Sequence, residues 1–376
     1  MWTEDMSITE EKILSKKTIC LVTKNMSVAG GAQRVTSLMA KELSSYYNVI
    51  VVSAMTDADG KIAYDFPENV KVIKATKGIK NATKAVLPAA KKIRKTLKDQ
   101  DVKVIFSVGA GAYLFVYAFS VFTRQKRVLC EHSSLANRID IRTAQKFYEW
   151  LGAKTAHQVI TLTKRDALHY EEKFHIKNVK NIYNWLDLQT VQRSAGYAKT
   201  SKKILTVGRI SKVKGFDMLL DIAQKVLPAH PDWEWHVYGD GPLLPEIRQE
   251  AEKRHLEKQL LFQGQCSDIY EKYGDYSFYV MTSYHEGLPM VLLEAQANYL
   301  PVISFDCETG PAEIITDSVN GYLVPVYDKT VMCEKINFLI ENEEVRNNMS
   351  VHSQDTLDRF DRETIVKIWR NLIERL

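Results

Sequence analysis

Short apolar runs alternate with helix-like segments along most of the chain, and this alternation limits the fold more than any other feature of the sequence. Residues 18–23 have the length and composition of a parallel strand that is covered on both faces. A loop with Gly30 and Gly31 follows, then a helical pattern from Val35 and a second apolar run at residues 49–52. This order predicts a βαβ unit. Further strands are expected at residues 70–73, 102–106, 128–130 and 158–161.

A second alternating series begins after a polar stretch at residues 189–203, which we interpret as a domain linker. Strands that alternate with helices form parallel sheets, so the sequence predicts an α/β fold with two Rossmann-like, doubly wound domains. We place them at residues 1–190 and 191–361, followed by an amphipathic helix at 362–376. In the second series we expect strands at 204–207, 233–238, 260–262, 278–281 and 302–304, and helices at 216–227, 244–254, 269–273, 290–297, 312–315 and 330–341.

The composition fits an ordinary globular protein. The chain has 376 residues, 45% of them hydrophobic and 26% charged, which is enough for two separate cores. A formal net charge of +5 is too small to indicate a nucleic-acid partner. The five cysteines show no C-x-x-C spacing, which favours reduced, buried thiols in a cytosolic protein.

Residues 104–123 form the one run that could span a bilayer, with twenty uncharged, mostly apolar residues. Gly109 and Gly111 interrupt this run where a strand would end and a helix begin. We therefore favour a buried strand and helix over a membrane span. Residues 1–17 have no apolar core of signal-peptide length, so export is not expected.

The stretch from Ser283 to Ala295 combines a loop, a proline and an apolar helical run. Pro289 suits the first helical position, which would leave the N–H groups of the helix start free to attract an anion. Glu286 and Glu294 flank this start, and carboxylates are suited to accept hydrogen bonds from sugar or ribose hydroxyls. The alternative is an ordinary amphipathic helix with a solvated glutamate.

Basic and glycine-rich turns follow other predicted strands. Arg209 and Lys214 come directly after the strand at 204–207, where ligands of parallel sheets gather, so they are candidates to bind a diphosphate and to stabilise it as a leaving group. The alternative is a solvated basic loop. Gly239 lies in a tight turn after the next strand. His132 follows the strand at 128–130 and is either a sugar contact, a proton carrier or a structural histidine.

Ten cations from Lys71 to Lys98 are uninterrupted by any acidic residue. Interleaved with apolar residues such as Ile93 and Leu97, they predict a basic amphipathic surface for anionic lipid headgroups. The alternative is a solvated helix, and no motif of a nucleic-acid-binding domain accompanies the charge. Metal-ligand, serine-hydrolase and P-loop motifs are also absent from the sequence.

Taken in order, these segments resemble bacterial retaining glycosyltransferases of family 4, which have the GT-B fold of two Rossmann-like domains facing across a cleft. The resemblance rests on GGAQRV at residues 30–35, EHS at 131–133, Gly208 and Arg209 with Lys214 and Gly215, GDGP at 239–242, Glu286 with Glu294, GPAEII at 310–315 and NGYLV at 320–324. One departure is Asn184-Trp185, where the family commonly has Asn-Pro or Asn-Gly, and it leaves the hinge conformation open.

The resemblance implies a nucleotide-sugar donor on the second domain and an acceptor on the first, with the last helix packing back on the first domain. Arg209 and Lys214 would hold the diphosphate, and Glu294 the ribose hydroxyls. Glu286 and His132 would contact the transferred sugar. The remaining implied donor contacts are backbone positions at Gly30, Gly31, Gly239, Gly287, Leu288, Pro289, Met290 and Val291.

The implied activity is transfer of a hexose or N-acetylhexosamine from a UDP-sugar to a lipid-linked or growing polysaccharide acceptor, with retention and without a metal cofactor. Relatives with such a GPAEII segment build capsule, exopolysaccharide or lipid-linked glycans at the cytoplasmic membrane face, where the cations from Lys71 to Lys98 would bind lipid. Two alternatives stay open: a sugar-nucleotide epimerase on the same fold, and a silent partner subunit that binds nucleotide or lipid without turnover.

Overall fold

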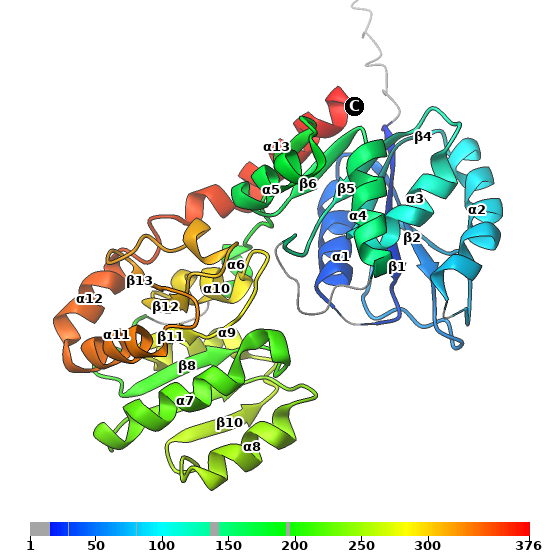
Figure 1. Ribbon diagram of the computed structural model, residues 1–376. Coiled ribbons are helices and arrows are strands. Elements are labelled where there is room, and N and C mark those ends of the chain that lie inside the picture. The colour runs from blue at the N-terminus through cyan, green and yellow to red at the C-terminus, as the bar shows by residue number, and fades with distance from the viewer. Residues whose placement is uncertain (1–15, 29, 80, 136–142, 193–195) are drawn as a thin grey trace, which may run out of the picture. The chain divides into compact units, whose positions relative to one another are not determined.

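The computed structural model describes residues 16–28, 30–79, 81–135, 143–192 and 196–376, and it contains two parallel sheets (Figure 1). The predicted α/β class with two Rossmann-like sheets is confirmed. The chain divides by its internal contacts into two compact units, Met1–Val108 with Ala112–Arg127, and Gly109–Gly111 with Val128–Leu376. The boundary near residue 190 stays a prediction.

The first sheet has seven strands in the order β3-β2-β1-β4-β5-β6-β7. The chain moves outward from β1 to β3 and then returns to the other side of β1 at β4, so the switch point lies between β1 and β4. Residues 19–22 of β1 are fully buried, which explains its uninterrupted apolar sequence. The strands are β1 Thr18–Asn25, β2 Asn48–Met55, β3 Lys71–Lys74, β4 Val102–Val108, β5 Lys126–Cys130, β6 Gln158–Thr161 and β7 Val179–Asn181.

The second sheet repeats this plan with six strands in the order β10-β9-β8-β11-β12-β13, and its switch point lies between β8 and β11. Its strands run parallel wherever their pairing is described. They are β8 Lys203–Val207, β9 Glu234–Tyr238, β10 Leu260–Gly264, β11 Phe278–Met281, β12 Val302–Phe305 and β13 Gly321–Val324.

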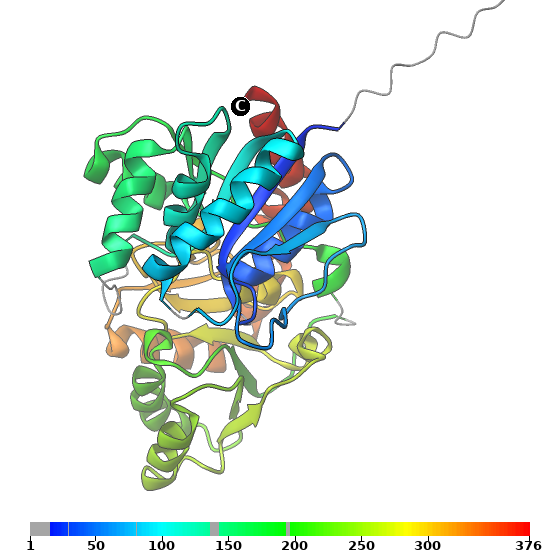
Figure 2. The same ribbon diagram turned by 90° about the vertical axis from the view of Figure 1, so that its right-hand side faces the viewer.

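Helices cover the sheets. In the first unit α2 and α3 lie side by side along one face of the sheet (Figures 1 and 2). The segment at 104–123 is a buried strand followed by α3, as predicted, and no described helix is long and apolar enough to cross a membrane. The helices accompanying the first sheet are α1 Gly31–Leu43, α2 Ala82–Asp99, α3 Tyr113–Ser120, α4 Thr143–Thr155 and α5 Lys164–Phe174. The short helix α6 Leu188–Val191 contacts α10 Met290–Ala297.

The second sheet is accompanied by α7 Phe216–Val226, α8 Leu244–Lys253, α9 Ile269–Lys272, α10 Met290–Ala297, α11 Lys329–Glu341 and α12 Glu343–Val351. The final helix, α13 Arg362–Arg375, is amphipathic as predicted: it buries Ile365, Trp369, Leu372 and Ile373 but leaves Ile368 exposed. Just before it, the Leu186 N–H donates to the Phe360 carbonyl.

Several local predictions need correction. The expected helix at 312–315 is a 3-10 turn at Pro311–Glu313, and the linker at 189–203 overlaps the short helix α6. Strands β7 and β13 were not predicted from the sequence. Cys266 is only partly buried, whereas the other four cysteines are buried and all five are free thiols.

Candidate active site

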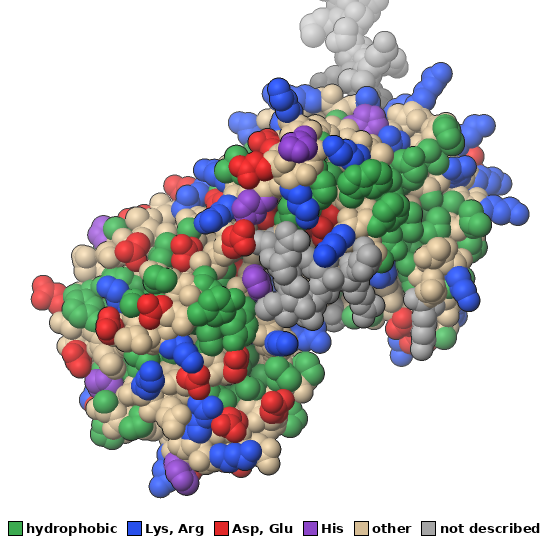
Figure 3. Space-filling view, viewed as in Figure 1, with side chains coloured by type: hydrophobic (Ala, Val, Ile, Leu, Met, Phe, Trp, Pro, Cys, Tyr) green, Lys and Arg blue, Asp and Glu red, His purple; other side chains and the backbone are tan. Residues whose placement is uncertain are grey.

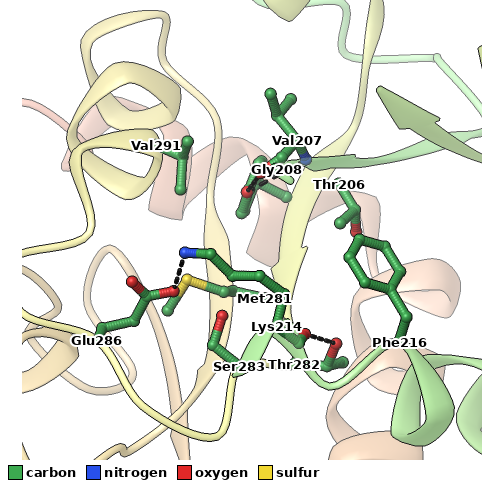
Figure 4. A pocket seen from close by; sticks show the side chains of 11 residues that line it. Thr206, Val207, Gly208, Lys214, Phe216, Met281, Thr282, Ser283, Glu286 and Val291 are labelled. Atoms are coloured by element: carbon green, nitrogen blue, oxygen red, sulfur yellow. Dashed lines mark hydrogen bonds and ion pairs between the residues drawn. The ribbon is translucent and has the colours of Figure 1, made fainter. Parts of the chain in front are cut away.

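A pocket lies beyond the carboxyl ends of β8 and β11, at the switch point of the second sheet (Figure 4). Open α/β sheets bind their ligands at this position, because here the loops after neighbouring strands diverge to opposite faces. The lining residues are Thr206, Val207, Gly208, Lys214, Phe216, Tyr279, Met281, Thr282, Ser283, Glu286 and Val291.

Lys214 and Glu286 form an ion pair inside this pocket. The Lys214 Nζ atom lies 2.6 Å from the Glu286 Oε1 atom, and the two side chains are 29% and 9% exposed. Lys214 belongs to a 3-10 turn after β8, and the Thr282 hydroxyl donates to its carbonyl. The sequence placed these two residues in one site but with separate ligands. The structure brings them together, so the lysine neutralises an acid that would otherwise repel phosphate.

Glycines let the loops around the pocket pack backbone against backbone. Gly239 has a φ of +143°, and a Cβ atom there would lie 1.9 Å from the Gly208 carbonyl oxygen. At Gly215, with a φ of +63°, a Cβ would lie 2.0 Å from the Thr282 carbonyl oxygen. Any larger residue would push these loops apart. The predicted turn at Gly239 is therefore a close packing of two strand ends.

Arg209 follows Gly208 and is exposed. No hydrogen bond or ion pair engages its guanidinium within the described part of the chain. It is not among the residues that line the pocket. Its exposed charge is thus open to a ligand, whereas the charge of Lys214 is paired with Glu286.

Glu294 is 6% exposed on α10 and accepts hydrogen bonds from two tyrosine hydroxyls. The Tyr270 and Tyr273 Oη atoms lie 3.2 and 3.3 Å from its two carboxylate oxygens. Burial and the nearby carboxylate raise the pKa of Tyr273 well above its usual value, so this hydroxyl remains a donor. Neither tyrosine was predicted as a site residue, although their spacing of three residues within the predicted helix at 269–273 was a readable signal.

The predicted helix at residues 290–297 is confirmed as α10, but Pro289 lies just before it rather than at its first position. Pro289 has a φ of −75° and a ψ of 92° and is the N-cap, so the helix begins at Met290. Gly310, with a φ of +102°, packs so closely that a Cβ atom would lie 2.4 Å from the Gly287 carbonyl oxygen. Leu288 is buried, and Val291 lines the pocket. This loop is therefore fixed by packing on the segment that carries the GPAEII motif.

His132 lies in the loop after β5, and its carbonyl oxygen would lie 3.2 Å from a Cβ at Gly287. The structure thus brings the His132 loop against the loop of Glu286. Both ring nitrogens are buried without a partner among the described residues. Burial lowers the pKa of His132 to about 4, so the imidazole is neutral at pH 7. It can exchange hydrogen bonds with a ligand but carries no charge.

Gly30 and Gly31 follow β1 at the switch point of the first sheet and belong to the first unit. Gly30 is the N-cap of α1. Apart from the chain neighbours of Gly31 and the nearby backbone of its own helix, no heavy atom of the described residues lies within 4 Å of the position that a Cβ on Gly31 would occupy. The open space beside Gly31 is compatible with the predicted approach of a ligand to the backbone.

The cations from Lys71 to Lys98 are exposed at every position that the structure describes, while Lys80 lies outside the described residues. Most of them lie on α2. The apolar stripe of this helix, with Ile93 and Leu97, is buried, whereas Leu87 is 80% exposed. The amphipathic pattern therefore serves the protein's own core, and the surface that remains is cationic with one exposed leucine. The space-filling view shows how Lys and Arg spread over the exposed surface of the molecule (Figure 3).

No group of three or more His, Cys, Asp or Glu side chains that could hold a metal ion occurs in the described part of the chain.

Comparison with known protein families decides the identity. A model described as "Glycosyltransferase Family 4" matches residues 29–190, and one described as "Glycosyl transferases group 1" matches residues 189–355. The chain belongs to the family 4 glycosyltransferases. Together the two matches extend over both sheets of this glycosyltransferase.

Two relatives with named activities align with nearly the whole chain. The amylovoran biosynthesis glycosyltransferase AmsD of Erwinia amylovora is 28% identical, with 94% of this chain and 99% of that protein aligned. An N-acetylgalactosamine-N,N'-diacetylbacillosaminyl-diphospho-undecaprenol 4-alpha-N-acetylgalactosaminyltransferase of Campylobacter jejuni is 24% identical, with 93% and 96% aligned. The crystal structure of Anabaena HepE in complex with UDP and glucose superposes with a TM-score of 0.79 at 19% identity, covering 95% of this chain and 99% of that chain. The last similarity establishes the GT-B fold.

Proposed function

We propose that this glycosyltransferase moves a hexose or N-acetylhexosamine from a UDP-sugar to a lipid-linked or growing polysaccharide acceptor, with retention of anomeric configuration. The observation that carries the proposal is the Lys214–Glu286 pair at the switch point of the second sheet. A cation and a carboxylate held side by side suit a ligand with a diphosphate next to a neutral, hydroxyl-rich sugar.

In this proposal Arg209 and Lys214 hold the diphosphate and stabilise the charge that develops as UDP leaves. Glu286 then accepts hydrogen bonds from the transferred sugar, together with the backbone from Gly287 to Val291. His132 contacts the same sugar through its neutral imidazole. The tyrosines that hold Glu294 orient its carboxylate, which accepts a hydrogen bond from a ribose hydroxyl.

The names of similar proteins support the substrate classes. HepE was crystallised with UDP and glucose, and the Campylobacter enzyme is named for an acceptor linked to diphospho-undecaprenol. AmsD is named for biosynthesis of amylovoran. These names favour UDP as the nucleotide and a glycan carried on a lipid as one acceptor class.

The proposal includes peripheral association with the cytoplasmic face of the membrane. The exposed cations on α2 support attraction to anionic lipid, at about 1 kcal/mol for each cation near the surface. Replacing Lys84, Lys91, Lys95 and Lys98 with Gln should weaken sedimentation with anionic vesicles strongly. Replacing Lys225, Lys258, Lys272 and Lys367 on the second unit is the matched control. Equal losses in both variants would remove the membrane assignment.

The proposal also includes the domain boundary near residue 190, the packing of the last helix on the first domain, and catalysis without a metal cofactor. The metal-free prediction has a direct test, since turnover should be unchanged after treatment with EDTA. A loss that is restored by Mg²⁺ or Mn²⁺ would contradict it.

The decisive experiment offers a panel of UDP-sugars together with a membrane lipid extract and measures UDP release coupled to a glycolipid product. Product formation distinguishes the transferase from both alternatives. A sugar-nucleotide epimerase would convert the donor without an acceptor, and a silent partner subunit would release no UDP. Release of UDP that requires the extract, with a product of higher mass, supports the proposal.

A further inference from the structure

The side chain of Glu131 is buried directly beside His132, and the mechanism above gives it no role. Glu131 follows β5 and is 4% exposed. Its Oε1 atom accepts three hydrogen bonds from the next two residues: from the His132 N–H at 3.0 Å, the Ser133 N–H at 3.0 Å and the Ser133 hydroxyl at 2.7 Å. One carboxylate oxygen therefore fixes the backbone of the whole turn.

Glu131 is also tied to two neighbouring elements. Its N–H donates to the Ile160 carbonyl of β6 at 2.8 Å, and its Oε2 atom accepts from the Tyr170 hydroxyl of α5 at 3.3 Å. The following residues are held in a similar way, because the Ser134 hydroxyl and the Leu135 N–H both donate to Asp166. Two buried acids thus anchor the loop that carries the histidine.

The imidazole of His132 has no such support of its own. Neither ring nitrogen has a hydrogen-bond partner among the described residues, although both are buried. The position of the ring therefore depends on the backbone of residues 131–133, which Glu131 holds on one side. On the other side, the His132 carbonyl packs against Gly287.

We propose that Glu131 is a positioning residue for sugar transfer, which acts by fixing the backbone from which the His132 imidazole reaches the substrate. This inference rests on the proposed function, in which His132 contacts the transferred sugar. Because the orientation of the ring depends on its backbone, a change in the backbone conformation of this turn would displace the ring. Small displacements near a reacting centre reduce the rate by large factors.

The charge of Glu131 is not required for this role. Burial raises its pKa to about 7, opposed by the hydrogen bonds from Ser133 and reinforced by Glu149 of α4 and Asp166 of α5. Cys130 and Tyr170 also face it, and each has its own pKa raised by burial. His169 lies beyond Asp166, with 4.0 Å between its Nδ1 atom and the Asp166 Oδ1 atom. A protonated Glu131 can donate to the Tyr170 oxygen from Oε2 and still accept all three loop hydrogen bonds at Oε1.

Glu131→Gln and Glu131→Ala should therefore have different effects on the loop and on kcat. A glutamine keeps one acceptor oxygen for the loop and presents an amide to the Tyr170 oxygen, whereas an alanine leaves the three loop donors and the Tyr170 hydroxyl without their acceptor. We expect kcat to stay within about threefold of wild type in E131Q and to fall at least about tenfold in E131A, with the donor KM nearly unchanged. Glu172→Gln, an exposed change of the same charge on α5, is the control.

A double-mutant cycle tests whether Glu131 acts through His132. If it does, E131A should lower kcat in the wild-type background but not in the His132→Ala background. The inference would be overturned if the reductions in kcat caused by E131A and His132→Ala multiplied in the double variant. It would also be overturned if kcat of E131Q were as low as that of E131A. If E131A does not fold, Ser133→Ala removes a single donor from Oε1, and its smaller loss should likewise vanish in the His132→Ala background.

Amide hydrogen exchange of the peptide containing residues 130–135 gives a readout without substrate. Exchange should be faster in E131A and unchanged in E131Q, and equal exchange in wild type and E131A would contradict the anchoring. Absence of turnover by the wild type with every UDP-sugar would instead contradict the proposed function. If the wild type is active but the effects of E131A and His132→Ala on kcat are independent, only the role of Glu131 is contradicted.

Discussion

The two sheets have the same strand order around their switch points but different chemistry there. The loops after β1 and β4 present small residues, Gly30 and Gly31 on one side and Gly109 to Ala112 on the other. The loops after β8 and β11 present Arg209, Lys214 and Glu286.

Topology alone therefore supplies a place where a ligand can bind, and the side chains decide which ligand it is. A ligand can approach the backbone closely where the loop residues are glycines, whereas a fixed cation binds an anionic ligand. The loop after β5 is a third case, with a neutral imidazole beside a buried acid.

Removing the cations of the second sheet should have the largest effect. Arg209→Ala and Lys214→Ala should each reduce kcat by roughly 100-fold, because each removes a charge that stabilises the leaving diphosphate. Only Lys214→Ala should also lower the free energy of unfolding, by about 1–3 kcal/mol, since it leaves the Glu286 carboxylate, which is only 9% exposed, without its partner.

Turnover assays and urea unfolding measure these two effects. Lys212→Ala, an exposed lysine in the same loop, should behave like wild type. Near-normal turnover rates in Arg209→Ala and Lys214→Ala would contradict the assignment of diphosphate binding to the loops of the second sheet.

Changing the loop after β5 should reveal two opposite pH dependences. The folded pKa of Glu131 is raised to about 7, so its contribution to stability is present at low pH and is lost as the pH rises through 7. The folded pKa of His132 is lowered to about 4, so its contribution is present above its unfolded pKa and is lost as the pH falls toward 4.

Between about pH 4 and 7 the two effects oppose each other, and each changes the free energy of unfolding by up to about 3 kcal/mol. Glu131→Gln should leave a stability that rises with pH in this range, and His132→Gln one that falls. Denaturant unfolding from pH 4 to pH 8 measures both slopes. Parallel curves for the two variants would show that these groups do not titrate as their burial predicts.

A glycine-to-alanine substitution should have different effects on stability in the two glycine-containing loops. Gly239→Ala should destabilise the protein by roughly 1–3 kcal/mol, because its Cβ would collide with the Gly208 carbonyl. Gly31→Ala should leave stability unchanged or raise it by up to about 1 kcal/mol, since Gly31 begins a helix and its Cβ would meet open space.

If a ligand approaches the Gly31 backbone, however, kcat/KM of Gly31→Ala should fall about tenfold. Thermal unfolding and steady-state kinetics distinguish the two outcomes. Full activity in Gly31→Ala would remove the first sheet's glycine loop from the donor site.

The sequence by itself determined the α/β class and most of the strands. This succeeded because a buried parallel strand needs an unbroken apolar run, as at residues 18–23 and 278–281. Apolar segments of helical length located α7 and α10, and the residues after the strands identified Lys214, Glu286 and His132 as site candidates.

Only the tertiary structure decided how these residues are paired. Lys214 and Glu286 are 72 positions apart, and no local pattern shows that they share a salt bridge rather than separate ligands. The same holds for the tyrosines on Glu294 and for Tyr170 on Glu131, 39 positions away. Secondary structure follows from local periodicity, whereas the charge state and orientation of a site residue depend on burial and on partners that folding brings from distant parts of the chain.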